Sequence, residues 1–254
     1  MPYYIGLSNL SNIRRCGNYA GRRKAERHKL LSAEARRILS LLKNKPFAEE
    51  NMAREENGRP FFIENGGREW GIDFSISHSG TLAAVSLVRG KNLRTACDLE
   101  LVRQRAGMKE IAEQFFSVSE RDYIFSKDLL SGIRFYEIWT LKECYLKLLG
   151  QTVFDMALVP SFINDNGQKQ GHFNFCGVVS SPLVFSLFEL SGGAGESYIL
   201  ATAIAGTEEE QPEFHWFSPA AADEAPAPGV SLPFRSIAKI KAALKPDETV
   251  RPKM

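Results

Sequence analysis

The sequence predicts an α/β (α+β) fold made of two similar halves in one chain. In each half, a segment with apolar residues at helical spacing precedes about three short apolar runs, which are separated by turns rich in Asn and Gly. Hydrophobic residues make up 44% of the 254 residues and charged residues 24%, which is typical of a globular chain. No residue-level repeat accompanies this duplicated pattern.

The first half is expected to contain an amphipathic helix over Ala25–Lys43, with arginines between its apolar positions. Asn-Gly turn signals then bracket the short extended run Phe61–Ile63. Three strands should follow, the first two joined by a tight loop at His78: Ile72–Ser77, Leu82–Val88 and Leu93–Leu101.

The second half is expected to open with a short helix over residues 108–116 and a capping box formed by Ser117 and Glu120. A longer helix should follow over about residues 132–149, with Ser131 as its N-cap. Gly150 can end this helix, and the expected strands are Gly171–Val178, Leu183–Leu190 and Ser197–Ala205.

These elements divide the chain into an N-terminal half at residues 1–101, a C-terminal half at 102–206, and a linker and tail at 207–254. After Thr207 the composition turns acidic and rich in Ala and Pro, as in a linker. A short basic amphipathic stretch, Phe234–Leu244, follows, and a helix is the structure we consider for it.

Composition argues against several classes of protein. A net charge of +2 gives no case for a nucleic-acid binder. No segment resembles a membrane span or a secretory signal, so we expect a cytoplasmic protein. The four cysteines form neither a C-x-x-C pair nor a zinc spacing, which predicts reduced thiols. Residues 14–37 nevertheless hold nine Lys or Arg against two Glu, so this segment is either a solvated helix face or a surface for a phosphorylated ligand or an acidic protein.

Two acidic side chains alternate in the expected strand Leu93–Leu101. Asp98 and Glu100 therefore point to one face, while Cys97 and Leu99 point to the other. Carboxylates this close repel each other unless a cation lies between them. The pair is a candidate metal site, although an exposed D-x-E on a strand is more often simply solvated.

The long helix carries a second candidate group. Trp139, Glu143 and Lys147 lie along one stripe, with Lys142 beside them. The stripe can set a metal ligand beside a phosphate-binding cation, or it can be packing by Trp139 next to an ordinary surface ion pair.

Candidate phosphate contacts lie in two turns of the first half. Ser77 and His78 can each donate a hydrogen bond to a phosphate oxygen, although a lone loop histidine is more often incidental. The turn Gly58-Arg59-Pro60 presents a guanidinium suited to bidentate phosphate contact, but it is equally ordinary in a surface turn.

The order of these motifs is more specific than any one of them: G-R-P, then S-I-S-H-S-G, C-D-L-E, F-F-S-x-x-E and W-T-L-K-E-x-x-x-K. Over about residues 20–205 the combination resembles the phosphopantetheinyl transferases of the broad-specificity, surfactin-synthetase-activating type. The resemblance implies two similar α/β halves with the active site in the cleft between them, and a monomer. It implies that Mg²⁺ is held by Asp98, Glu100 and Glu143, and that coenzyme A is contacted by Arg59, Ser77, His78, Lys147, Lys24 and Arg37.

The implied reaction transfers the 4′-phosphopantetheine arm of coenzyme A to a serine of an acyl, peptidyl or aryl carrier protein. Such carriers serve fatty-acid, polyketide or nonribosomal-peptide assembly. Glu143, Lys147 and His78 are the expected catalytic residues, with Glu143 as the candidate base. Two alternatives stay open: a non-catalytic module that binds coenzyme A or a carrier protein, and a Mg²⁺-dependent phosphohydrolase.

Overall fold

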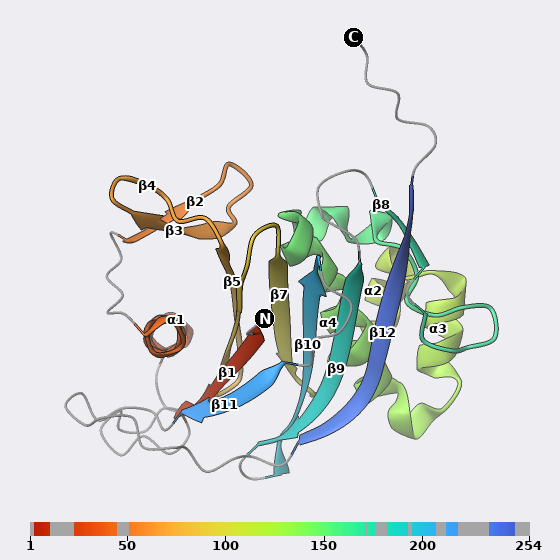
Figure 1. Cartoon of the computed structure of the whole chain (residues 1–254). Helices are drawn as coiled ribbons and strands as arrows, with labels where there is room; N and C mark the ends of the chain where they lie inside the picture. Colours follow the sequence, from red (N-terminus) through yellow and green to blue (C-terminus); the bar gives the residue numbers. More distant parts are fainter. Residues whose placement is uncertain are drawn as a thin grey trace.

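The computed structural model describes eight segments of the chain, which are residues 3–10, 23–44, 51–170, 172–175, 182–192, 195–206, 212–217 and 234–246. They form an α/β structure with two main sheets that meet edge to edge, flanked by helices on both sides (Figure 1). The predicted fold class is therefore confirmed, while the similarity of the two halves stays a prediction. No helix in these segments is both long and apolar enough to span a membrane.

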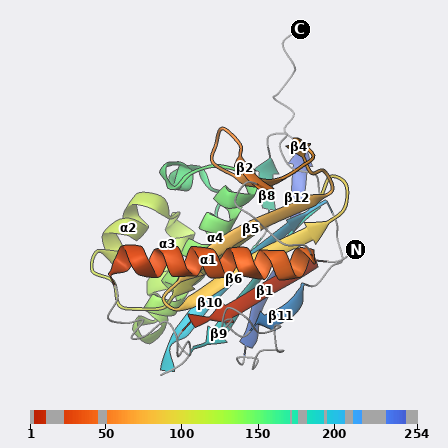
Figure 2. The same cartoon turned by 90° about the vertical axis from the view of Figure 1, so that its left-hand side faces the viewer.

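The first sheet has the strand order β11-β1-β6-β5 and carries the long helix α1 on its outer face (Figure 2). Helix α1 buries Leu31, Ala35 and Ile38 against the sheet. Gly6 makes the close approach possible, because a Cβ there would lie 2.3 Å from Ile38 Cγ2. The elements are β1 (Tyr3–Asn9), α1 (Lys24–Lys43), β5 (Ile72–Ser79), β6 (Leu82–Arg89) and β11 (Glu213–Phe217).

The second sheet has the order β7-β10-β9-β12-β8 and packs one face against α4, the longest helix of the second half. Alternation sorts its side chains: Ile199 and Ala201 of β10 face α4, whereas Tyr198 and Leu200 face the strands of the first sheet. The elements are β7 (Arg94–Leu101), α2 (Met108–Phe115), α3 (Val118–Phe125), α4 (Ser131–Leu149), β8 (His172–Phe175), β9 (Leu183–Ser191), β10 (Ser197–Ala205) and β12 (Phe234–Pro246).

A small third sheet, β2-β3-β4, stands at one edge of the molecule (Figure 1). Its strands are Met52–Arg54, Pro60–Glu64 and Gly67–Arg68. Two 3₁₀ turns, Asp128–Leu130 and Val153–Leu158, flank the two ends of α4.

Several predicted elements are confirmed by the structure. Helix α1 and strands β6, β7, β9 and β10 lie within one or two residues of the expected bounds. Ser117 and Glu120 form the predicted capping box of α3. Gly150 ends α4 with φ 72°, the left-handed conformation that glycine adopts without strain.

Other predictions were wrong. His78 lies within β5, which continues to Ser79, and not in a loop. Ser131 does not cap α4; it is the first helical residue, and its hydroxyl donates to the Asp128 carbonyl. The predicted division at residue 101 stays a prediction; it assigns β7 to the N-terminal half, and β7 pairs with β10 in the second sheet.

The tail also differs from the expectation of a linker. Strand β11 pairs in parallel with β1, and the stretch predicted as a basic helix is β12, which pairs with β9 and β8. Ile240 of β12 is buried in the core beneath α4. The acidic run Glu208–Glu210 and the Ala/Pro-rich segment 219–229 lie outside the described residues, as do Cys16 and Cys176. Among the described residues, Cys97 and Cys144 are free and buried.

Candidate functional site

The two carboxylates of β7 lie on the face of the strand that α4 covers. Asp98 is 5% exposed, and its Oδ1 accepts hydrogen bonds from Ser77 Oγ at 3.0 Å and Lys147 Nζ at 2.7 Å. Its Oδ2 is buried and has no hydrogen-bond partner in the described part of the chain. An acceptor in this state lacks the partner that burial normally requires.

Glu100 and Glu143 extend this acidic group. Glu100 Oε2 accepts from Ser79 Oγ at 2.8 Å, and burial together with the Asp98 charge raises the pKa of Glu100. Burial, then the charges of Asp98 and Glu100, raise the pKa of Glu143 to about 7, against the opposing effect of Lys147. The three carboxylates therefore repel one another across one space.

Lys147 is the cation of this group, and it pairs with Asp98 on β7. One interpretation of the sequence was an ordinary surface ion pair between Lys147 and Glu143, and the structure does not show that pair. Its Nζ also donates to Ser77 Oγ at 3.1 Å and to the Cys97 carbonyl at 3.3 Å. Burial disfavours its charge, yet the surrounding acidic groups, of which Asp98 contributes most, together outweigh burial and raise the pKa of Lys147. Lys147 is therefore protonated at physiological pH.

The donor set fits a hard divalent cation. In the residues that the structure describes, no three acidic, imidazole or thiol side chains are gathered tightly enough to enclose an ion. The unpartnered Asp98 Oδ2 and the raised pKa values of Glu100 and Glu143 nevertheless mark a place where positive charge is missing. All donors are oxygens, as Mg²⁺ prefers, and Mg²⁺ commonly completes its shell with ligand and water oxygens.

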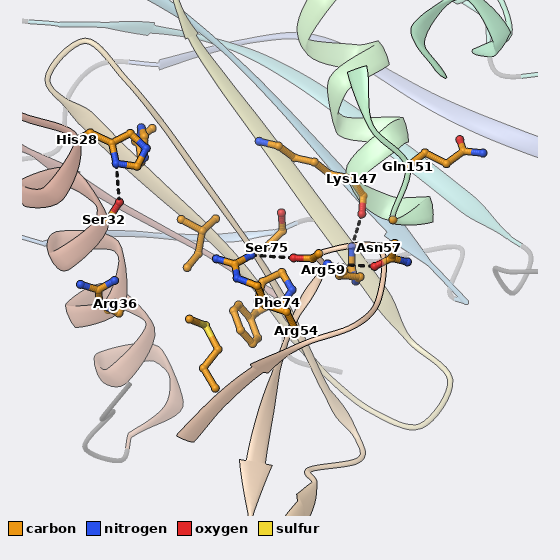
Figure 3. A pocket seen from close by; sticks show the side chains of 16 residues that line it. His28, Ser32, Arg36, Arg54, Asn57, Arg59, Phe74, Ser75, Lys147 and Gln151 are labelled. Atoms are coloured by element: carbon orange, nitrogen blue, oxygen red, sulfur yellow. Dashed lines mark hydrogen bonds between the residues drawn. The ribbon is translucent and has the colours of Figure 1, made fainter. Parts of the chain in front are cut away.

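A cavity of about 370 Å³ is lined by Lys147, the partner of Asp98, whereas the three carboxylates are not among its lining residues (Figure 3). Helix α1 supplies one wall through His28, Ser32 and Arg36, and the C-terminal end of α4 supplies the opposite wall through Lys147 and Gln151. The β2–β3 turn and β5 close the remaining sides, with Arg54, Asn57, Arg59, Phe74, Ser75 and His78 among the lining residues. Cations from three separate segments thus face one space, which favours a ligand with several phosphate groups.

Arg59 is not the exposed guanidinium of a surface turn. The residue is 5% exposed, and Nη2 pairs with Asp73 at 2.5 Å and donates to the Thr95 carbonyl at 2.8 Å. Nη1 donates to the Lys147 carbonyl, so only Nε is left without a partner among the described residues. Arg59 therefore joins the β2–β3 turn to β5, β7 and α4 from within the wall of the cavity.

Ser77 and His78 contribute differently from each other. The Ser77 hydroxyl donates to Asp98 and accepts from Lys147 Nζ and the Leu99 amide, so protein groups occupy it fully. The His78 ring lies edge-on to His28, with ring centroids 4.6 Å apart. Burial and then the neighbouring His28 lower the pKa of His78, so a neutral imidazole faces the cavity near pH 7.

Of the two basic residues expected to contact coenzyme A from α1, neither lines the cavity of Figure 3. Lys24 lines a neighbouring space of about 580 Å³, on the other side of His78. Arg37 pairs with Glu34 at 2.6 Å, and Arg36, one residue earlier, lines the main cavity instead. The sequence holds a signal for Arg36 as a lining residue, because Arg36 follows His28 and Ser32 at intervals of four residues and so lies on the same face of the helix.

Lys142 was expected beside the stripe, but it points away from the site. It is 1% exposed and pairs with Glu120 at 3.1 Å, while its Nζ also donates to the Val159 carbonyl. Trp139, 9% exposed, packs in the core against Phe135, as the alternative reading of the stripe predicted.

Comparison with known proteins finds a family match in the second half. Residues 94–203, which contain both β7 and α4, match the 4′-phosphopantetheinyl transferase superfamily. This confirms the resemblance seen in the motifs of this region. The G-R-P and S-H-S motifs lie before the matched residues, so the structure is what connects them to the site.

Characterised relatives carry the same activity in their names. The chain is 32% identical to the 4′-phosphopantetheinyl transferase gsp of Aneurinibacillus migulanus over 46% of this chain and 44% of that protein. It is 30% identical to the 4′-phosphopantetheinyl transferase AcpT of Escherichia coli K12 over 42% of this chain and 52% of AcpT. It is 31% identical to the 4′-phosphopantetheinyl transferase HetI of Nostoc sp. over 42% of this chain and 46% of HetI. The chain thus spans about half the length of the relatives that it matches.

Proposed function

We propose that this chain, whose residues 94–203 match the 4′-phosphopantetheinyl transferase superfamily, transfers the 4′-phosphopantetheine arm of coenzyme A to a serine of a carrier protein. The observation that carries the proposal is the link between the acidic group and a cationic cavity: Lys147, which lines the cavity together with His28, His78, Arg36 and Arg54, pairs with Asp98. A diphosphate ester of coenzyme A needs both a metal site and surrounding cations, and this arrangement offers both.

In the proposed reaction, the serine oxygen attacks the β-phosphorus of coenzyme A. A new oxygen–phosphorus bond forms to the phosphopantetheine arm, and the bond to the adenosine diphosphate part breaks. Negative charge grows on the bridging and terminal phosphate oxygens. The serine proton passes to a base, and the carboxylate of Glu143, which lies in the acidic group with Asp98 and Glu100, is the candidate.

Mg²⁺ would be held by Asp98, Glu100 and Glu143. When bound, it supplies positive charge that offsets the charge developing on the diphosphate oxygens. Lys147 is proposed to bind a phosphate oxygen by releasing its longest contact, the 3.3 Å bond to the Cys97 carbonyl. His78 is proposed to donate to another phosphate oxygen as a neutral imidazole, and Arg59 to hold the turn that borders the coenzyme.

The basic residues of α1 are proposed to bind the phosphate on the coenzyme's ribose, with Arg36 facing the main cavity and Lys24 facing the neighbouring one. An acyl, peptidyl or aryl carrier protein is the proposed acceptor. A cytoplasmic location and a monomeric state stay predictions of the sequence.

The test is to incubate the protein with coenzyme A, Mg²⁺ and an apo carrier protein, and to measure the intact mass of the carrier together with the fate of coenzyme A. Transfer predicts a carrier heavier by the phosphopantetheine arm. A phosphohydrolase would consume coenzyme A and leave the carrier unchanged, and a binding module would change neither. Either of these two results, with several carriers tried, contradicts the proposal.

A further inference from the structure

Strands β5 and β7 lie side by side where the two main sheets meet, although each is the edge strand of its own sheet (Figure 1). They share no backbone ladder. The edge of a strand normally presents amide and carbonyl groups that need partners, and burial makes a missing partner costly.

Side chains of β5 accept hydrogen bonds from three amide groups of β7, those of residues 95, 99 and 101. Asp73 Oδ2 accepts from the Thr95 amide at 2.8 Å. Ser77 Oγ accepts from the Leu99 amide at 3.1 Å, and Ser79 Oγ from the Leu101 amide at 3.0 Å. Because alternate residues of a strand point the same way, one face of β5 matches one edge of β7 in register.

Cationic side chains from outside both strands donate hydrogen bonds to carbonyl groups on the same edge of β7. Arg59 donates to the Thr95 carbonyl at 2.8 Å, and Lys147 donates to the Cys97 carbonyl at 3.3 Å. The G-R-P, S-H-S and K-E-x-x-x-K motifs therefore meet along β7 and supply partners for backbone groups on the edge that faces β5.

We infer that Asp73, Ser77 and Ser79 form a side-chain ladder that joins the two sheets, and that Ser79 is a positioning residue for Glu100. The Ser79 hydroxyl accepts the Leu101 amide and donates to Glu100 Oε2 at 2.8 Å. One hydroxyl thus fixes both the backbone of β7 and the direction of a carboxylate that projects from it. Ser77 repeats the arrangement one step earlier, with the Leu99 amide and Asp98 Oδ1.

The ladder ties the wall of the cavity to the acidic group. Strand β5 carries Phe74, Ser75 and His78 into the cavity, and the same strand holds Glu100 through Ser79. The neighbouring turn is anchored as well, because the Thr81 amide donates to Tyr198 Oη of β10 at 3.2 Å. A shift of β5 relative to β7 would therefore move the carboxylates with respect to the ligand.

Amide hydrogen exchange followed by NMR tests the ladder directly. The variants are Ser79→Ala, Ser79→Thr, which keeps the hydroxyl on a side chain that suits a strand, and Ser186→Ala as a matched control. Ser186 lies in the middle of β9, and its side chain makes no hydrogen bond to a described residue. Ser79→Ala should speed exchange at the Leu101 amide about five- to tenfold, as the loss of one hydrogen bond predicts. Ser79→Thr and Ser186→Ala should leave Leu101 near the wild-type rate.

The second readout is Mg²⁺ affinity by calorimetry, which rests on the proposed function, whereas the exchange readout does not. Ser79→Ala should weaken Mg²⁺ binding several-fold, with recovery in Ser79→Thr. Unchanged exchange at Leu101 in Ser79→Ala overturns the ladder. Faster exchange with unchanged Mg²⁺ affinity overturns the positioning role. If the wild type binds no Mg²⁺, the proposed metal site fails, and the exchange result alone decides the ladder.

Discussion

Replacing Glu143 by Gln should stabilise the metal-free protein at alkaline pH. Burial and the charges of Asp98 and Glu100 raise the pKa of Glu143 from the ordinary 4.5 to about 7 in the folded protein. A group with a raised folded-state pKa contributes stability that is complete below the unfolded value and is lost as the pH rises through the folded value. Each unit by which the pKa is raised corresponds to about 1.4 kcal/mol, so the free energy of unfolding that is lost above pH 7 is at most about 3 kcal/mol. Partial exposure and relaxation of the site reduce it.

The assay is urea unfolding of wild type and Glu143→Gln in the presence of a chelator, at pH 5 and pH 8.5. Glutamine keeps the shape and removes the charge, so the variant should be more stable than wild type by about 1–3 kcal/mol at pH 8.5 and nearly equal to it at pH 5. Added Mg²⁺ should stabilise the wild type more than the variant, because the ion offsets the same repulsion. A stability difference between wild type and variant that is the same at both pH values would show that the pKa of Glu143 is not raised in the folded protein.

Three further perturbations test the remaining framework. Arg59→Ala should destabilise the protein by about 3–5 kcal/mol in urea unfolding, because it leaves the buried Asp73 carboxylate without its cation. The loss should depend little on salt, and a stable variant with only weakened coenzyme binding would contradict this prediction. Truncation after Ala205 removes β11 and β12 and should give an aggregating protein of low melting temperature, whereas a soluble, fully active fragment would show these strands to be dispensable. Lys142→Met should lower the free energy of unfolding by about 3–5 kcal/mol in the same assay, because it removes the cation that pairs with Glu120, which is 0% exposed. An unchanged unfolding midpoint would show that the Glu120 charge does not depend on Lys142.

The acidic part of the site could be predicted from the sequence because its geometry is local. Alternation along a strand puts Asp98 and Glu100 on one face, and helical spacing aligns Glu143 with Lys147. The pairing of Lys147 with Asp98 could not be predicted in this way, because the two residues are 49 positions apart and meet only where α4 packs on β7.

The misplacement of His78 has a physical reason. The S-H-S-G run resembles a turn, yet Ser77 and Ser79 are strand residues whose hydroxyls replace the missing backbone partners of β7. The turn itself begins at Gly80, where φ is 56° and a Cβ would lie 2.5 Å from Tyr198 Oη. The serines of this strand are therefore polar because their hydroxyls accept hydrogen bonds from backbone amides of β7, and not because the strand faces solvent.

The tail was misread for a similar reason. The segment Phe234–Leu244 alternates basic and apolar residues only over Ala238–Ala242, so its pattern is as compatible with a strand as with a short helix. Composition alone favoured a solvated tail. What decides the structure is a long-range partner, since β12 adds to the open edge of β9 and buries Ile240 there.

The rate of transfer as a function of Mg²⁺ concentration, in wild type and Asp98→Asn at saturating coenzyme A, tests the central claim most directly. Asparagine keeps the shape of the side chain but removes one charge from the proposed metal site. We expect Asp98→Asn to need a much higher Mg²⁺ concentration for half-maximal transfer. Excess Mg²⁺ should recover part of the rate, and a chelator should abolish transfer in both proteins. Normal transfer by Asp98→Asn at limiting Mg²⁺ would contradict the assignment of the β7 carboxylates as the metal site.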